Sequence, residues 1–142
     1  MRDLITQVTA LNLGCTYAGT IINLLAYADD MVVLASSWQA LQSILVVIED
    51  AASKISMSFN TKKTVCMPCM VFNPCDRRKI ICDTFPQSTL AGCMLQFVEH
   101  FRYLSHIIDS CLSDDKDIQR EIKALFTRTN MLCRRLKYVH YK

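Results

Sequence analysis

Hydrophobic residues recur along the chain at alternating steps of three and four in three places, and this spacing predicts three helices. The first is expected over residues 3–11, where Gly14 is expected to act as the stop signal. The second is expected after an N-cap at Ser36 or Ser37 and is expected to end near Asn60. Its apolar face is formed by Trp38, Leu41, Leu45, Ile48, Ala52, Ile55 and Phe59.

A third helix is expected after Asp114 or Asp115, near the end of the sequence. Its basic residues mostly lie off the apolar face, so the helix is expected to be amphipathic, apolar on one side and basic on the other. The apolar face is formed by Ile118, Ile122, Leu125, Thr129, Leu132, Leu136 and Val139.

Shorter runs rich in Val, Ile and Leu predict strands. Residues 21–27 and 31–35 are expected to be two buried strands joined by a tight hairpin, because only a few residues separate them. Further strands are expected over residues 16–20, 64–72, 79–82 (pairing back on the preceding strand), 94–98 and 102–108. The order helix, hairpin, helix, several strands, helix predicts an α+β fold.

Length and composition narrow the class of protein. The chain has 142 residues, of which 51% are hydrophobic and 20% charged, which is typical of one globular domain or part of a larger one. No run of 18 apolar residues predicts a membrane span, and no secretory signal is expected at the start. Eight cysteines without such a signal indicate a reducing compartment, the cytoplasm or nucleus. Cys66 and Cys69 form a C-x-x-C pair, but no second pair has similar spacing, so zinc is not expected.

Positive charge is concentrated near the end of the sequence. The net charge is +3, yet residues 116–142 alone carry eight basic and two acidic side chains. A basic segment attached to a mildly acidic body indicates a polyanion partner such as nucleic acid. The alternative is a helix face that is merely solvated.

Two adjacent acids, Asp29 and Asp30, lie where the tip of the predicted hairpin is expected. Neighbouring carboxylates repel each other, and a divalent cation reverses that cost. Magnesium binds carboxylate oxygens and commonly adds waters and substrate phosphates. The pattern therefore indicates a metal site for nucleotidyl transfer, with a plain solvated turn as the alternative.

Four segments of the sequence resemble, in order, conserved blocks of reverse transcriptases from non-LTR (LINE-type) retrotransposons. Residues 22–34 (INLLAYADDMVVL) resemble the catalytic hairpin, and residues 58–64 (SFNTKKT) the block that follows it. Residues 101–109 (FRYLSHIID) are similar to the primer-grip block, and residues 117–124 (DIQREIKA) to the start of the thumb. In the primer grip, Ser105 stands where the family usually has Gly, which tolerates positive φ better.

The resemblance implies an RNA-directed DNA polymerase that acts on an RNA template, a DNA primer and deoxynucleoside triphosphates, and it implies no membrane partner. Asp29 and Asp30 would be the catalytic acids and the ligands of Mg²⁺ or Mn²⁺, and Lys63 would lie near the triphosphate. Tyr27, Tyr103 and Leu104 would lie near the primer. The nucleic-acid backbone would be contacted by Lys123, Arg128, Arg134 and Arg135.

The implied architecture is a partial polymerase palm over residues 1–110, with the catalytic hairpin and a helix on a small antiparallel sheet. Residues 111–142 would be the start of the thumb, an amphipathic helix. In the family another catalytic Asp precedes the paired acids, whereas Asp3 is the only acid before Asp29 here, and the fingers are absent. We therefore expect the isolated chain to have little or no polymerase activity. The alternative is a non-catalytic nucleic-acid-binding or interaction module derived from a retrotransposon.

Overall fold

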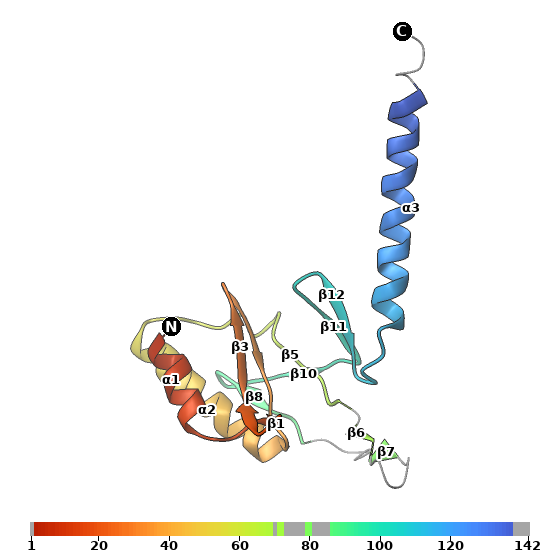
Figure 1. Ribbon diagram of the computed structural model, residues 1–142. Coiled ribbons are helices and arrows are strands. Elements are labelled where there is room, and N and C mark those ends of the chain that lie inside the picture. The colour runs from red at the N-terminus through yellow and green to blue at the C-terminus, as the bar shows by residue number, and fades with distance from the viewer. Residues whose placement is uncertain (1, 70, 73–78, 81–85, 138–142) are drawn as a thin grey trace. The chain divides into compact units, whose positions relative to one another are not determined.

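The protein is represented by a computed structural model that describes residues 2–69, 71–72, 79–80 and 86–137. Within these residues the helices are α1 (Arg2–Ala10), α2 (Trp38–Lys54) and α3 (Asp115–Lys137). The strands are β1 (Cys15–Tyr17), β2 (Thr20–Ile22), β3 (Leu24–Tyr27), β4 (Asp30–Val33), β5 (Val65–Cys66), β6 (Val71–Phe72), β7 (Lys79–Ile80), β8 (Thr89–Leu90), β9 (Cys93–Met94), β10 (Gln96–Phe97), β11 (His100–Tyr103) and β12 (His106–Asp109). The predicted α+β class is confirmed (Figure 1).

The strands pair into small two-stranded sheets. Five pairs among the described residues are antiparallel hairpins, and β5 pairs with β10 in parallel. The chain divides into two compact units, residues 1–66 with 82–97 and residues 67–81 with 98–142. The functional division expected after residue 110 stays a prediction. None of the described helices has the length and apolarity that a membrane crossing requires.

The core of the first unit lies where α1 and α2 pack on one face of the β3–β4 hairpin (Figure 1). Leu4 and Val8 of α1 are buried against Ile44 and Ile48 of α2. On the hairpin, alternate residues on one face pack on this cluster, among them Leu24, Met31 and Val33. A second cluster joins α2 to β8 and the residue after β9, and consists of Leu45, Leu90 and Leu95.

Helix α2 begins where it was predicted to begin and ends earlier. The Ser37 side chain accepts a hydrogen bond from the Ala40 N–H at 3.2 Å, which confirms it as the N-cap. The helix ends at Lys54 rather than near Asn60. Ser56 has a φ of 54°, and Met57 N–H donates to the Ala52 carbonyl at 3.0 Å, which closes the helix in a Schellman motif.

The segment between α1 and β3 also differs from its prediction. Helix α1 ends at Ala10, and the stop is at Asn12, with a φ of 51°, rather than at Gly14. Gly14 instead permits a close approach, because an added Cβ would lie 2.6 Å from the Ile22 carbonyl oxygen. The strand expected over residues 21–27 is interrupted at Asn23. This side chain is only 4% exposed and donates to the Val8 carbonyl at 2.8 Å.

In the second unit, the strand expected over residues 102–108 is wrong. The chain turns back at Leu104 and Ser105, and β11 pairs with β12 in an antiparallel hairpin. Both turn residues have positive φ, 46° and 75°, which is the requirement of a type I′ turn. The position where Gly is usual in the resembled family therefore has a left-handed backbone here, although it is occupied by Ser.

Three other predicted strands are observed in part. The strand expected over 64–72 consists of the separate short strands β5 and β6. The pairing expected for 79–82 is confirmed for Lys79–Ile80, which pairs with β6, and Cys82 lies outside the described residues. Within 94–98 the structure has β10, preceded by the hairpin of β8 and β9.

Candidate functional site

The two adjacent acids lie at the tip of the β3–β4 hairpin. Tyr27 pairs with Asp30, so Ala28 and Asp29 are the two central residues of the turn. Ala28 has a φ of 50°, and positive φ at the first central residue is typical of a type II′ turn. The predicted hairpin with its acids at the tip is thus confirmed. Both carboxylates are exposed to solvent.

The hairpin has one covered face and one open face. Residues paired directly across it point to the same side, so Tyr27 and Asp30 lie on the face opposite Leu24 and Met31. Leu24 and Met31 pack on the core, whereas Tyr27 is 63% exposed. The expectation that the strand containing Tyr27 is buried is therefore wrong, because helices cover only one side of the β3–β4 hairpin.

The donor set at the tip fits a magnesium ion only in part. Asp29 and Asp30 offer carboxylate oxygens, and magnesium accepts one or two protein carboxylates completed by phosphates and waters. No group of three or more His, Cys, Asp and Glu side chains gathers in the described part of the chain. A two-ion site would need at least one further carboxylate, so the tip by itself supplies only part of the required ligand set.

Lys63 follows α2 in a compact turn of the first unit. The Asn60 carbonyl accepts the N–H groups of Lys63 and Thr64, each at 3.0 Å, and also the Thr64 hydroxyl at 3.0 Å. These three hydrogen bonds on one carbonyl fix the segment 60–64 and leave the Lys63 side chain exposed. The Asn and Lys-Thr residues of this block thus form one local structural element.

Tyr103 and Leu104 lie at the turn of the β11–β12 hairpin in the second unit. Tyr103 pairs with His106 and is half-buried, whereas Leu104 is exposed at the first turn position. The proposed primer-side residues therefore fall in two units, with Tyr27 in the first and these two in the second.

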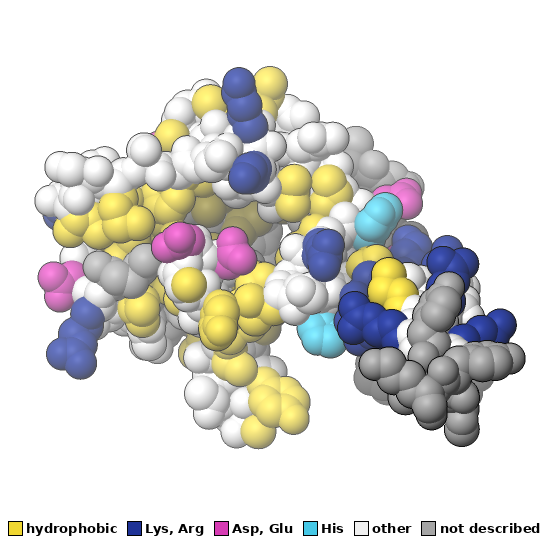
Figure 2. Space-filling view, turned by 90° about the horizontal axis from the view of Figure 1, so that it is seen from above, with side chains coloured by type: hydrophobic (Ala, Val, Ile, Leu, Met, Phe, Trp, Pro, Cys, Tyr) yellow, Lys and Arg dark blue, Asp and Glu magenta, His cyan; other side chains and the backbone are white. Residues whose placement is uncertain are grey.

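The basic residues of α3 are exposed, except for the partly buried Arg120. In Figure 2, which looks along α3, Lys and Arg side chains gather around the helix. Lys116 and Arg120 are held in ion pairs at the first turns. Within the residues that the structure describes, no ion pair engages Lys123, Arg128, Arg134, Arg135 or Lys137.

Sequence reasoning missed a cluster of acids that joins α3 to β12. Asp117 accepts hydrogen bonds from Ile107 N–H and from Arg120 Nε, each at 2.9 Å, and its other oxygen lies 2.8 Å from His106 Nδ1. The hydrogen bonds from Arg120, His106 and Ile107 hold the pKa of Asp117 well below its usual range. An acid in a first helical turn was visible in the sequence, but its partners ten and eleven residues earlier were not.

A second acid of this cluster lies on β12. The mostly buried Asp109 carboxylate pairs with Lys116 at 2.5 Å and accepts Cys111 N–H at 2.8 Å. The hydrogen bond from Lys116 lowers the pKa of Asp109, and the same bond raises the pKa of Lys116. Two acid-mediated contacts, one from each element, therefore fix the first turn of α3 against the hairpin.

No protein-family model, no curated protein and no solved structure matches the chain.

Proposed function

We propose that the chain is the C-terminal palm segment and the start of the thumb of a non-LTR retrotransposon reverse transcriptase. The observation that carries the proposal is the Tyr27-Ala28-Asp29-Asp30 turn, an exposed two-residue hairpin tip with adjacent carboxylates. Three further blocks that resemble the same family follow it in order. The left-handed backbone at Ser105 supports the assignment, because the family usually has glycine at that position.

In this function Asp29 and Asp30 would hold a divalent cation. With a further carboxylate to complete its ligand set, such an ion would supply stabilisation of the charge that develops in phosphoryl transfer. Lys63 places an exposed ammonium where it neutralises triphosphate charge. Tyr27, on the open face of the hairpin, packs against the primer end. Because the third acid is not among the residues that gather here, we expect this chain alone to extend primers poorly or not at all.

Metal-linked binding of a primer–template tests the proposal without requiring turnover. Anisotropy of a labelled RNA–DNA primer–template is measured in Ca²⁺ and in EDTA, for the wild type and for Asp29→Asn. We expect tighter binding in Ca²⁺, and we expect that gain to disappear in Asp29→Asn. The matched control is Asp50→Asn, which removes an exposed acid of α2 and should keep the gain. Equal binding by the wild type and Asp29→Asn in Ca²⁺ would contradict the polymerase assignment.

A second candidate function is nucleic-acid binding without catalysis. The exposed cations of α3 that form no ion pair with a described residue favour it. Lysines and arginines of this kind contact phosphates without reading sequence. The same measurement separates the two functions. The non-catalytic function is supported if the affinity is unchanged by the metal and by Asp29→Asn but falls when Arg134 and Arg135 are replaced by Ala.

A further inference from the structure

Five apolar residues of α3 and Thr129 form a row with a period of 3.5 residues. They alternate by four and three over most of three heptads, which is the spacing of the inner positions of a coiled coil. Within the described residues the row consists of Ile118, Ile122, Leu125, Thr129, Leu132 and Leu136. No residue of α3 is buried, and the side chain of Leu125 is 64% exposed. The row is therefore without a partner.

An open row of this kind leaves a long helix weakly stabilised. Most of the stability of a protein helix comes from packing of its apolar face rather than from helix propensity. Helix α3 has 23 residues and contacts β12 through Lys116 and Asp117, which lie off the row. The contacts with the hairpin consequently leave the apolar row open to another helix.

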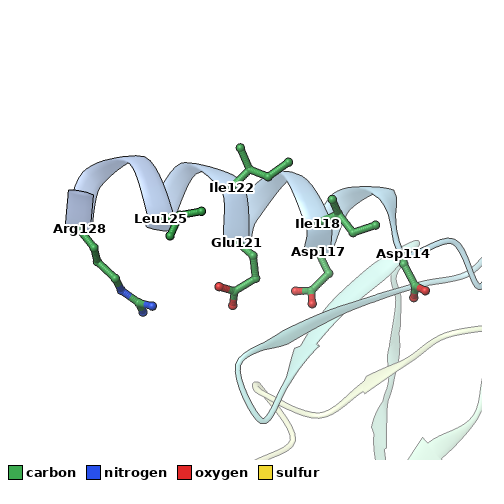
Figure 3. A pocket seen from close by; sticks show the side chains of 7 residues that line it. All are labelled: Asp114, Asp117, Ile118, Glu121, Ile122, Leu125 and Arg128. Atoms are coloured by element: carbon green, nitrogen blue, oxygen red, sulfur yellow. The ribbon is translucent and has the colours of Figure 1, made fainter. Parts of the chain in front are cut away.

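Charges flank one side of this row at intervals of seven residues. Figure 3 shows a shallow hollow along the helix, lined by Asp114, Asp117, Ile118, Glu121, Ile122, Leu125 and Arg128. Along this side the residues that flank the row change from acidic to basic in the order Asp114, Glu121, Arg128, Arg135. When two copies of such a flank lie antiparallel, the acidic end of each copy faces the basic end of the other.

We propose that the apolar face of α3 binds a second copy of the same helix in antiparallel orientation. In this register Ile118 faces Leu136 of the other copy, Ile122 faces Leu132 and Leu125 faces Thr129. Each Glu121 then lies beside Arg135 of the other copy, so the symmetric pair contains this contact twice. Charges that flank a coiled-coil row determine partner choice and orientation.

The charge pattern favours the antiparallel orientation over the parallel one. In a parallel pair the flank with Glu121 and Arg128 meets the opposite flank of its partner, which contains Gln119, Phe126 and Cys133. That flank carries no charge, so no ion pair forms. Glu121 contacts Arg120 at 2.7 Å within the helix, and this exposed contact is readily exchanged because surface ion pairs contribute little.

The antiparallel pair also leaves a basic surface for nucleic acid. Lys123, Arg134 and Lys137 lie on the side of the helix away from the apolar row. Arg128 is the exception to this charge complementarity, because it lies beside Arg128 of the other copy near the symmetry axis. This like-charge contact identifies a position where substitution should tighten the pair. The inference stands on α3 alone and does not depend on the polymerase assignment.

Sedimentation velocity of the full chain over a range of concentrations tests the proposal by charge exchange. We expect a monomer–dimer equilibrium for the wild type. We expect Glu121→Arg and Arg135→Glu each to weaken the dimer by about tenfold, since each change converts two attractive contacts into repulsive ones. The double variant Glu121→Arg/Arg135→Glu should restore the wild-type dissociation constant. Arg128→Gln should tighten the dimer severalfold, because a neutral side chain removes the repulsion between the two copies of Arg128.

Circular dichroism of each variant verifies that the helix content is unchanged, because all of these positions are exposed. A chain that stays monomeric at 100 µM, on the order of a weak complex, would overturn the proposal. A dimer in which the double variant fails to restore binding would also overturn it, since the antiparallel contact between positions 121 and 135 requires that rescue. Association that persists in Leu125→Glu would also overturn the proposal, because it would place the contact between copies elsewhere on the chain.

Discussion

The Asp117 carboxylate on the first turn of α3 accepts the backbone N–H of Ile107 on β12, with 2.9 Å between the oxygen and the nitrogen. Together with the contact between Lys116 and Asp109, this bond joins the helix to the hairpin whose turn contains Tyr103 and Leu104. If the second unit contacts nucleic acid, the basic helix and this hairpin turn are positioned by the same two acids.

The Asp117 contact predicts a pH dependence of stability. The pKa of Asp117 is lower in the folded state than its ordinary value of 3.8, so the unfolded chain binds more protons at acidic pH. Its contribution is fully present above the unfolded pKa and is lost as the pH falls through the folded pKa. We expect Asp117→Asn to lower the urea midpoint at pH 7 and to flatten the decline of stability below pH 4.

The matched control is Asp114→Asn, which removes a neighbouring exposed acid whose side chain makes no hydrogen bond within the described residues. The stability of this variant should decline below pH 4 as steeply as that of the wild type. Asp109 has a lowered pKa as well, so Asp117→Asn should retain part of the acid dependence. A wild-type profile in Asp117→Asn would show that the ionised Asp117 carboxylate contributes nothing to the decline of stability at acidic pH.

Ser105→Gly is expected to stabilise the protein. Ser105 has a φ of 75°, and glycine adopts this conformation without the steric cost that other residues incur. We expect a gain of about 1 kcal/mol in the free energy of unfolding, measured by urea titration. Ser58→Gly is the control, because Ser58 is exposed and has no positive φ, and it should lose about 0.5 kcal/mol. Equal losses in both variants would mean that the turn stores no strain.

Asn23→Asp is expected to destabilise the first unit. The buried Asn23 amide donates to the Val8 carbonyl, and a carboxylate of the same size would place negative charge against that oxygen. We expect a loss of about 2 kcal/mol at pH 7, with less loss at pH 3, where the acid is protonated. Asn130→Asp, on the exposed surface of α3, should change stability by about 0.5 kcal/mol or less.

Nucleic-acid binding by α3 is expected to depend steeply on salt. Replacing Lys123 and Arg134 by Ala removes two cations, so the slope of log affinity against log salt for a single-stranded RNA should become shallower by about 1.4. The control replaces Lys54 and Lys62 of the first unit, which are exposed, and should leave the slope unchanged. An identical slope in both double variants would place the nucleic-acid contact away from α3.

Apolar spacing and local capping chemistry predicted the parts of the fold that depend on near neighbours. The hairpin around Asp29, the N-cap at Ser37 and the amphipathic character of α3 follow from such patterns, and the structure has all three. The acid pair at the hairpin tip was found because it interrupts two apolar runs. The roles of Lys63, Tyr103 and Leu104 stay predictions, because they depend on ligands and not on the fold of this chain.

The errors arose where a residue other than glycine adopts a left-handed backbone. Ser56 ends α2 and Ser105 closes the β11–β12 turn, and neither position carries the glycine that normally identifies such a stop or turn. The apolar spacing therefore continued past Lys54 and through the hairpin. Contacts between distant residues, such as Asn23 with Val8, leave no periodic pattern in a single sequence.

Helix α3 is attached to β12 near one end, so a rotation at the attachment displaces its other end. A helix of 23 residues is about 34 Å long, so a rotation of about 5° at the contact between Asp117 and Ile107 would move its far end by roughly 3 Å. Arg134 and Arg135 lie near that far end, and a displacement of this size equals the length of a hydrogen bond. A small change in the geometry of this one carboxylate would thus displace Arg134 and Arg135 far enough to make or break the phosphate contacts proposed for them.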